Sequence, residues 1–212
     1  VPPGADTPLA ELSATVLDTE TTGLDAATAR LLSVGAVRLH GTRVFHGAVL
    51  ERLVDPGVDI PLRATAVHGL TNAMIAGAPA FADILPDLEA FLADTLIVGH
   101  NIRFDLAVLS REMARAGSPW TKPLSLDTAL LFMALEPDAD SLSLEALAAH
   151  FGVAIQGRHT ALGDSLVTAE IYVRMVPRLR DKGVASFGDA LDLQRVAMRK
   201  AGIPEEPALG TA

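Results

Sequence analysis

Two acids interrupt the first apolar run of the chain, Asp18 and Glu20 in the stretch VLDTETTGLD. Because side chains alternate between the faces of a strand, residues two apart point the same way. Carboxylates that share a face repel each other and lose hydration beside apolar neighbours unless a cation lies between them. The pair indicates a divalent-metal site, or else an exposed strand end that only serves the turn at Gly23, and its spacing leaves both interpretations open.

A third acid, Asp105, lies in the segment HNIRFDLAVLSREM. The helical spacing of Ile102 and Leu109 belongs to an apolar stripe, and Asp105 lies at the edge of that stripe. A carboxylate in this position must reach water, pair with Arg103 or Arg111, or hold a cation. Asp105 is therefore a further candidate ligand, with the ion pairs as the alternative.

A fourth acid, Asp164, and a histidine, His159, lie in RHTALGDSLVTAEIYVRM. The apolar residues of this helix form two opposite stripes, which predicts packing on both faces, and Asp164 continues the stripe of Val167 and Ile171. An ionised acid there requires a partner, and no nearby basic residue follows the same stripe. An imidazole at a helix entry can take up a proton near neutral pH, although a lone histidine there is more often a cap or a surface residue. Spacing alone does not show whether the four acids and the histidine converge.

The elements that must position these residues follow from hydrophobic periodicity. Three consecutive strands come first, and after them strands alternate with helices. The predicted strands are 14–18, 31–39, 43–54, 95–99 and 124–127, and the predicted helices are 81–92, 101–117, 128–135, 143–151, 160–175 and 187–201. Asn101 is expected to cap the helix that carries Asp105, and Gly117 to end it. This order favours an α/β sheet covered by helices.

Composition limits the class of protein. The 212 residues are 50% hydrophobic, which is enough for one compact domain with a core. The formal net charge of −9 excludes a protein that binds polyanions through bulk positive charge. The absence of cysteine excludes disulfides, thiolate nucleophiles and Cys-ligated zinc. Any phosphate partner would need cations placed locally.

The two ends of the sequence differ from its centre. Both are rich in Pro and small residues, so 1–13 is expected to be a linker-like segment, 14–202 a single domain and 203–212 a flexible tail. Such ends would suit a fusion to another domain in a longer chain. No apolar run approaches the ~18 residues that span a bilayer, and no secretory segment opens the sequence, so we expect a cytoplasmic protein with no membrane partner.

The sequences DTETTG, HNIRFD and RHTALGDS, in this order, resemble the three motifs of the DEDDh branch of 3′-5′ exonucleases, which includes the proofreading epsilon subunits of bacterial DNA polymerase III. The resemblance extends from Thr15 to Val176. VHGLT matches the segment that approaches the 3′-terminal nucleotide in this family, and SLSLEALAAHFGV resembles the helix before the last motif. His159, five residues before Asp164, marks this branch, whereas a Tyr one position later would mark the sister branch.

The resemblance implies a ribonuclease-H-like fold, a mixed five-stranded sheet with its second strand antiparallel, flanked by helices. It also implies two divalent metal ions, Mg²⁺ or Mn²⁺, which suit hard oxygen ligands and, when ~3.5–4 Å apart, stabilise both oxygens of an in-line phosphodiester displacement. By matching positions, Asp18 would bridge the ions, and Glu20 and Asp164 would hold the ion that carries the attacking water. Asp105 would support the second ion, and His159 would be the general base.

The resemblance further implies a set of residues that line the terminal nucleotide, namely Thr21, Gly23, His68, Asn101 and Phe104. Within this set, Phe104 is expected to stack on a base. The predicted function is a metal-dependent 3′-5′ exonuclease that releases nucleoside 5′-monophosphates from single-stranded or frayed 3′ ends, with DNA preferred over RNA.

Two alternatives accompany this prediction. One is an RNA 3′-end trimming exoribonuclease or oligoribonuclease, because the sequence does not identify the neighbours of a 2′-hydroxyl. The other is a non-catalytic interaction module with the same fold, against which stands the intact set of four acids and one histidine. Near the C-terminus, QRVAMRKAG is basic and helical and does not resemble a clamp-binding peptide, so association with a polymerase or sliding clamp is not predicted.

Overall fold

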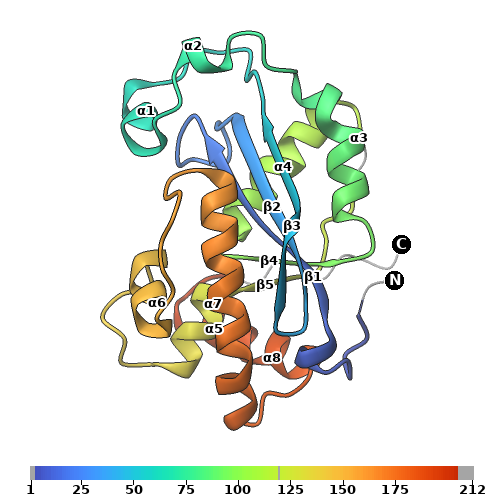
Figure 1. Ribbon diagram of the computed structural model, residues 1–212, viewed down its shortest axis with the longest axis vertical. Coiled ribbons are helices and arrows are strands. Elements are labelled where there is room, and N and C mark those ends of the chain that lie inside the picture. The colour runs from blue at the N-terminus through green and yellow to red at the C-terminus, as the bar shows by residue number, and fades with distance from the viewer. Residues whose placement is uncertain (1–2, 119, 205–212) are drawn as a thin grey trace.

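A mixed five-stranded sheet forms the centre of the computed structural model, which describes residues 3–118 and 120–204. The strand order is β3-β2-β1-β4-β5 (Figure 1). β2 pairs antiparallel with β1 and β3, whereas β4 runs parallel to both β1 and β5. Hairpins join the antiparallel strands, and the parallel strands need crossover helices, as the sequence order requires. The predicted ribonuclease-H-like sheet is confirmed.

The elements follow the predicted order closely. The strands are β1 (Ser13–Thr21), β2 (Leu31–His40), β3 (Arg43–Leu53), β4 (Leu96–Gly99) and β5 (Ser125–Asp127). The helices are η1 (Leu9–Glu11), α1 (Leu62–His68), α2 (Asn72–Ile75), α3 (Phe81–Leu92), α4 (Arg103–Arg115), α5 (Thr128–Leu135), α6 (Leu144–Phe151), α7 (Ala161–Asp181) and α8 (Phe187–Lys200). The short helices η1, α1 and α2 were not predicted.

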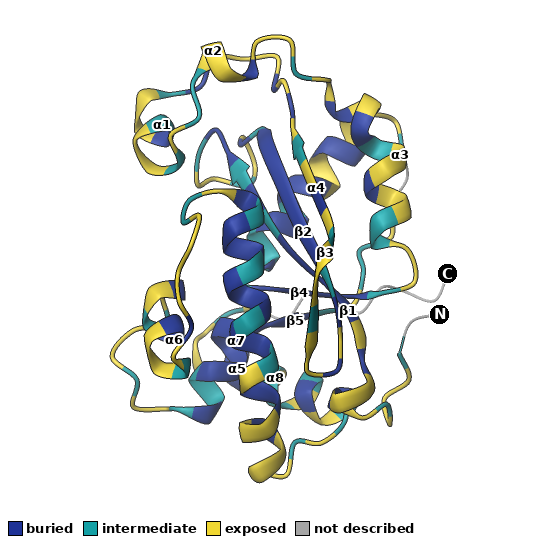
Figure 2. Ribbon diagram, viewed as in Figure 1, coloured by how far each residue is buried: buried dark blue, intermediate teal, exposed yellow. Residues whose placement is uncertain are grey.

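Helices cover both faces of the sheet (Figure 1). Val16 of β1 belongs to the core cluster shared with α5, α6, α7 and α8, whereas Leu17 belongs to the cluster shared with α3 and α4. The alternation of side chains along β1 is therefore as predicted. Buried residues line the inner sides of these layers, and the small lobe of α1 and α2 is largely exposed (Figure 2). Among the described residues, no helix has the length and apolar character needed to cross a membrane.

Two segments differ from the expectation. Within the predicted linker-like segment 1–13, Leu9 and Leu12 are fully buried, and the backbone N–H of Leu9 donates to the Ala185 carbonyl at 2.8 Å. This part of the chain therefore packs onto the domain. The expectation of a linker rested on its proline and small residues and did not consider these two leucines. Asn101 is not the helix cap: α4 starts at Arg103, and Asn101 has a left-handed φ of 55°. Most of the predicted tail, 205–212, lies outside the described residues.

Candidate active site

Three acids from distant parts of the sequence meet at one end of β1. Asp18 and Glu20 extend from β1, and Asp164 extends from the first turn of α7. Each offers a carboxylate oxygen, and these oxygens all lie within 4.8 Å of one another. The interpretation of Asp18 and Glu20 as a simple exposed strand end is therefore wrong, since both are partly buried beside a third acid.

A glycine allows this approach. Gly35 of β2 lies opposite Asp18 in the antiparallel register. A Cβ at Gly35 would lie 2.1 Å from the backbone nitrogen of Leu162 in the first turn of α7, a separation that atoms do not tolerate. The hydroxyl of Ser165 donates to the Gly35 carbonyl at 2.8 Å and fixes the contact. The start of α7 therefore rests directly on the sheet, which brings Asp164 to the acids of β1.

The fourth acid, Asp105, reaches the same end of the sheet from α4, on the opposite face. It is 5% exposed, and its Oδ1 accepts a hydrogen bond of 2.6 Å from the hydroxyl of Thr19. Burial raises the pKa of Asp105 to about 7, although this hydrogen bond opposes the shift. The hydroxyl of Thr19 is thus the side-chain partner that the structure gives to Asp105, in place of the basic residues considered from the sequence.

The acids destabilise one another's charged forms. Burial, followed by the charges of Asp105, Asp164 and Glu20, raises the pKa of Asp18 well above its ordinary value. Burial and the charge of Asp164 raise the pKa of Glu20 from 4.5 to about 7. The Asp105 charge acting on Asp18 places all four acids within electrostatic reach of one another. In a low-dielectric setting, positive charge beside such a group stabilises its ionised form.

The donor set fits a divalent cation. Asp164 is 4% exposed, and its Oδ1 is a buried oxygen without a hydrogen-bond partner in the described part of the chain. A buried carboxylate oxygen that no donor satisfies is costly unless a ligand approaches it. Carboxylate oxygens are the ligands that Mg²⁺ and Mn²⁺ prefer. Asp18, Glu20 and Asp164 therefore form a site into which such an ion would fit, with Asp105 beside it.

A strained loop carries His159 to this cluster. Gly157 and His159 have left-handed φ angles of 66° and 61°, and only the glycine adopts this conformation without strain. The Thr160 hydroxyl closes the loop, since it donates to the Gly157 carbonyl at 2.6 Å and accepts from the Gly163 backbone N–H at 3.1 Å. The charge of His159 influences the pKa of Asp164, so the ring lies beside the acids.

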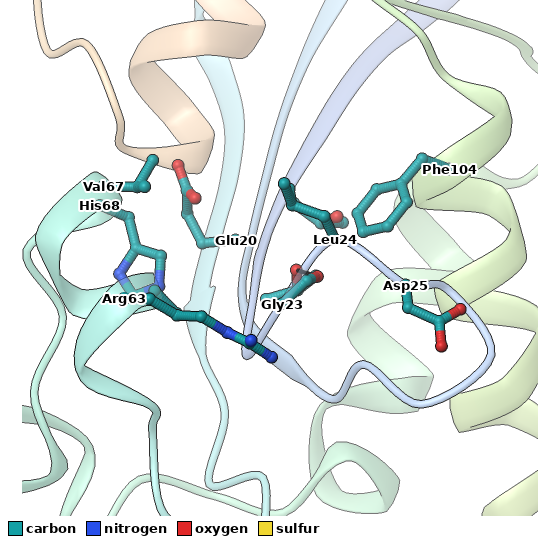
Figure 3. A pocket seen from close by; sticks show the side chains of 11 residues that line it. Glu20, Gly23, Leu24, Asp25, Arg63, Val67, His68 and Phe104 are labelled. Atoms are coloured by element: carbon teal, nitrogen blue, oxygen red, sulfur yellow. Dashed lines mark hydrogen bonds between the residues drawn. The ribbon is translucent and has the colours of Figure 1, made fainter.

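A cavity of about 420 Å³ opens beside Glu20 (Figure 3). Its lining residues are Thr19, Glu20, Thr21, Gly23, Leu24, Asp25, Arg63, Ala64, Val67, His68 and Phe104. Four of the five residues predicted to line a terminal nucleotide, Thr21, Gly23, His68 and Phe104, are therefore brought together. Asn101 is not among them. Its backbone N–H instead donates to Oδ1 of the buried Asp127 at 3.1 Å.

His68 presents an unsatisfied donor in this cavity. Its Nδ1 accepts the Leu70 backbone N–H at 3.0 Å, so the neutral ring carries its proton on Nε2. That Nε2 is buried and has no hydrogen-bond partner among the described residues. Burial lowers the pKa of His68, the nearby Thr21 backbone opposes this shift, and the charge of His159 adds to it. In its neutral form, His68 thus offers an Nε2–H donor on the cavity wall, near His159.

Two further lining residues, Leu24 and Arg63, were not predicted, because no local pattern distinguishes them. Leu24 is 94% exposed, although it belongs to a loop closed by hydrogen bonds between Thr22 and Arg30. Arg63 extends from α1 across the cavity toward Gly23 (Figure 3). Arg63 is the one lysine or arginine among the lining residues, and it has no ion-pair partner in the described ranges. Both side chains are available to a ligand.

Comparison with known proteins gives matches over most of the chain. The family model for exonucleases, RNase_T, matches residues 15–172. The DNA polymerase III subunit epsilon-like protein of Rhodobacter capsulatus is 41% identical over 190 residues, which are 88% of this chain and 27% of that protein. The DNA polymerase III subunit epsilon of Aquifex aeolicus is 33% identical over 189 residues, which are 87% of this chain and 90% of that protein.

Solved structures with the same fold include two exonucleases bound to DNA. Exonuclease I of E. coli, in complex with a dT13 oligonucleotide, superposes with a TM-score of 0.71 at 20% identity, over 82% of this chain and 43% of that chain. Exonuclease X, in complex with 5′ overhanging duplex DNA, superposes with a TM-score of 0.66 at 24% identity, over 85% of this chain and 99% of that chain. The chain spans less than half of the first of these structures and about a quarter of the Rhodobacter relative.

Proposed function

Because the chain belongs to the RNase_T family of exonucleases, enzymes that hydrolyse phosphodiester bonds, we propose that it is a metal-dependent 3′-5′ exonuclease acting on single-stranded or frayed DNA ends. The observation that carries this proposal is the junction of two features at Glu20. The side chain of Glu20 belongs both to the cluster with Asp18 and Asp164 and to the wall of a cavity large enough for a nucleotide. A bond placed at this junction would be cut one nucleotide from an end.

Asp18, Glu20 and Asp164 would hold a divalent cation, and Asp105 would support a second. Such ions, when bound, stabilise the charge of the attacking and leaving oxygens in phosphodiester displacement. The protein residues do the rest of the positioning. Thr19 orients Asp105 through its 2.6 Å hydrogen bond, and the Gly35 contact holds α7 so that Asp164 faces β1. The cations also reconcile the formal net charge of −9 with a polyanionic substrate.

His159 would accept the proton of the attacking water. The closed loop from Gly157 to Thr160 supports this role, because it holds the imidazole near Asp164, and within the described part of the chain the hydrogen-bond partner of the ring is Arg158. A general base contributes about 10²–10⁴-fold to a rate without holding the metal. His159→Ala should therefore retain Mn²⁺ binding and lose turnover. A folded His159→Ala variant with normal single-turnover kinetics would remove this assignment.

The cavity would hold the 3′-terminal nucleotide. Phe104 offers a ring for stacking, His68 offers an Nε2–H donor, and Leu24 offers an apolar edge. Arg63 would contact a phosphate near the mouth, because a guanidinium without a protein partner is well suited to this role. The DNA polymerase III names of the two relatives and the DNA in the two similar structures support DNA as the substrate.

The test compares wild type with Asp18→Asn on a 5′-labelled single-stranded oligomer, as DNA and as RNA, with and without Mn²⁺. We expect the labelled DNA to shorten stepwise with Mn²⁺, and to stay intact with chelator or with Asp18→Asn. A 3′-blocked oligomer should resist digestion, whereas a 5′-blocked one should not. Full activity after metal removal, or digestion of circular DNA, would contradict the mechanism. Faster digestion of the RNA would redirect the proposal to an exoribonuclease.

A further inference from the structure

Arg158 lies against the acid cluster and is held there from two sides. Its Nε donates to Glu145 Oε1 of α6 at 2.7 Å, and its Nη1 donates to Asp164 Oδ2. The same Nη1 is 3.4 Å from His159 Nδ1. The side chain is 27% exposed, so this guanidinium is a largely enclosed charge and not a surface arginine. Although the motif RHTALGDS begins with Arg158, the sequence assigned it no role, because it does not follow the stripe of Asp164; it reaches that acid from the loop before α7.

The guanidinium acts on the whole cluster. Its charge opposes the raised pKa values of Asp18, Glu20 and Asp164, which means that it stabilises their ionised forms. A neighbouring histidine, His100, adds no positive charge of its own, because burial and the charge of Arg158 lower its pKa to about 4. Arg158 therefore supplies the positive charge nearest to Asp164 among the described residues.

We propose that Arg158 is a resident counter-ion of the acid cluster, which competes with divalent cations for Asp164 and so sets the metal affinity of the site. This inference rests on the proposed function, in which the cluster holds such cations. Glu145 also takes part, because its carboxylate accepts a hydrogen bond from the same guanidinium. The positive charge of Arg158 is then shared between Glu145 and Asp164, which weakens its interaction with Asp164.

Arg158 has a second effect, which opposes the first. By holding Asp164 Oδ2, it leaves Oδ1 without a partner and turned toward other ligands, so it also restricts the rotation of that carboxylate. Fixing one short side chain changes an affinity by only a few-fold. A full charge in contact with a ligand of a doubly charged ion changes it by at least about tenfold, even with strong dielectric screening. The charge effect therefore decides the sign.

The experiment is calorimetric titration of Mn²⁺ into the chelator-treated protein at a pH of ~8.5, above the pKa of about 7 of Glu20 and Asp105, so that proton release does not offset the effect of the guanidinium. Arg158→Gln should bind Mn²⁺ at least ~10-fold more tightly than wild type. Arg158→Lys keeps the charge and loses the fork geometry, so its affinity should stay near that of wild type. Glu145→Gln should weaken binding, because the released guanidinium then turns fully to Asp164. The same change made in Arg158→Gln should have a smaller effect.

Arg174→Gln is the matched control. Arg174 also forms an ion pair with a glutamate, Glu170, at 3.1 Å, but it lies ten residues beyond Asp164 on α7, about 15 Å along the helix. Its Mn²⁺ affinity should equal that of wild type. A second readout is thermal unfolding: without metal, Arg158→Gln should melt below wild type, and Mn²⁺ should raise its melting temperature by more.

The outcomes separate the two proposals. If wild type binds no Mn²⁺, the proposed function itself fails. If wild type binds Mn²⁺ and Arg158→Gln binds it equally or more weakly, Arg158 is an orienting residue and the competition is refuted. Should Arg158→Gln fail to fold, Glu145→Gln still decides, because the competition requires weaker binding and an unchanged affinity contradicts it.

Discussion

Gly35→Ala tests whether the contact between β2 and α7 builds the acid cluster. The new Cβ would lie 2.1 Å from Leu162 N, 2.2 Å from the carbonyl carbon of Ala161 and 2.4 Å from the Cα of Leu162. All three are backbone atoms, so no side chain can rotate away. Restoring the 3.4 Å of an ordinary contact requires the start of α7 or the strand to move by about 1.3 Å.

The energetic cost follows from that displacement. Overpacking in a core costs about 1–3 kcal/mol, and a clash between backbone atoms belongs at the upper end of this range. For a chain of this length, 3 kcal/mol lowers the melting temperature by roughly 6–12 °C. The shift also moves Asp164 relative to Asp18, and a misplacement of about 1 Å reduces turnover by about 10²-fold. We expect Mn²⁺ affinity to fall together with turnover.

Gly47→Ala is the control, because Gly47 also lies in a strand and a Cβ there meets nothing within 4 Å. Both substitutions remove the same backbone freedom from the unfolded chain, so their difference isolates the clash. Thermal and urea unfolding give stability, and single-turnover digestion with Mn²⁺ gives the rate. If Gly35→Ala matches Gly47→Ala in stability and rate, the reasoning that α7 rests on this glycine is wrong.

Four further predictions concern the acids and the cavity. Because the pKa of Glu20 is raised from 4.5 to about 7, the folded state binds the extra proton, so the metal-free protein should lose stability as pH rises across this window; Glu20→Gln should flatten that slope in urea titrations. Thr19→Val removes the buried donor to Asp105 and should cost ~1–3 kcal/mol with weaker Mn²⁺ binding, and an unchanged unfolding midpoint would contradict this. Asp18→Asn should raise the melting temperature of the chelated protein and abolish the stabilisation by Mn²⁺; a lower metal-free melting temperature would refute the repulsion argument. Arg63→Gln should raise KM at unchanged kcat and reduce the slope of log KM against log salt by about one, and an unchanged slope would remove the phosphate contact.

Periodicity predicted much of the fold because each layer has its own repeat. The twofold alternation at Val16 and Leu17 and the stripe of α7 each reflect burial on a defined face. Local patterns also indicated that Asp105 and Asp164 needed partners. What they could not supply was the identity of those partners, since Thr19 and Asp105 are 86 positions apart and meet only when α4 packs on β1.

Other features depend on how closely two elements approach in the folded protein, and the local sequence pattern does not indicate this distance. In the sequence, Gly35 is one residue of a predicted strand with no evident role. The structure shows that the absence of a side chain at Gly35 allows α7 to pack against β2. Asn101 looks like a helix cap by composition, but its backbone turns left-handed so that its N–H can reach Asp127, itself buried at 3% exposure. Arg63 of α1 and Leu24 of the loop after β1 line the same cavity. Their shared role follows from the packing of these two segments, which the local sequence does not indicate.

The cost of the acid cluster bears on the alternative of a non-catalytic module. Burial and repulsion from neighbouring acids, Asp127 in the case of Asp105, raise the pKa values of Asp18, Glu20 and Asp105, so each acid destabilises the folded protein when it is ionised. The protein nevertheless supports them with specific structure, including the Thr19 donor and the Gly35 contact. A module that bound partners elsewhere on its surface would be more stable with apolar residues at these positions. A buried arrangement that costs stability on its own and becomes favourable when a cation binds is therefore best explained by a site that uses the cation.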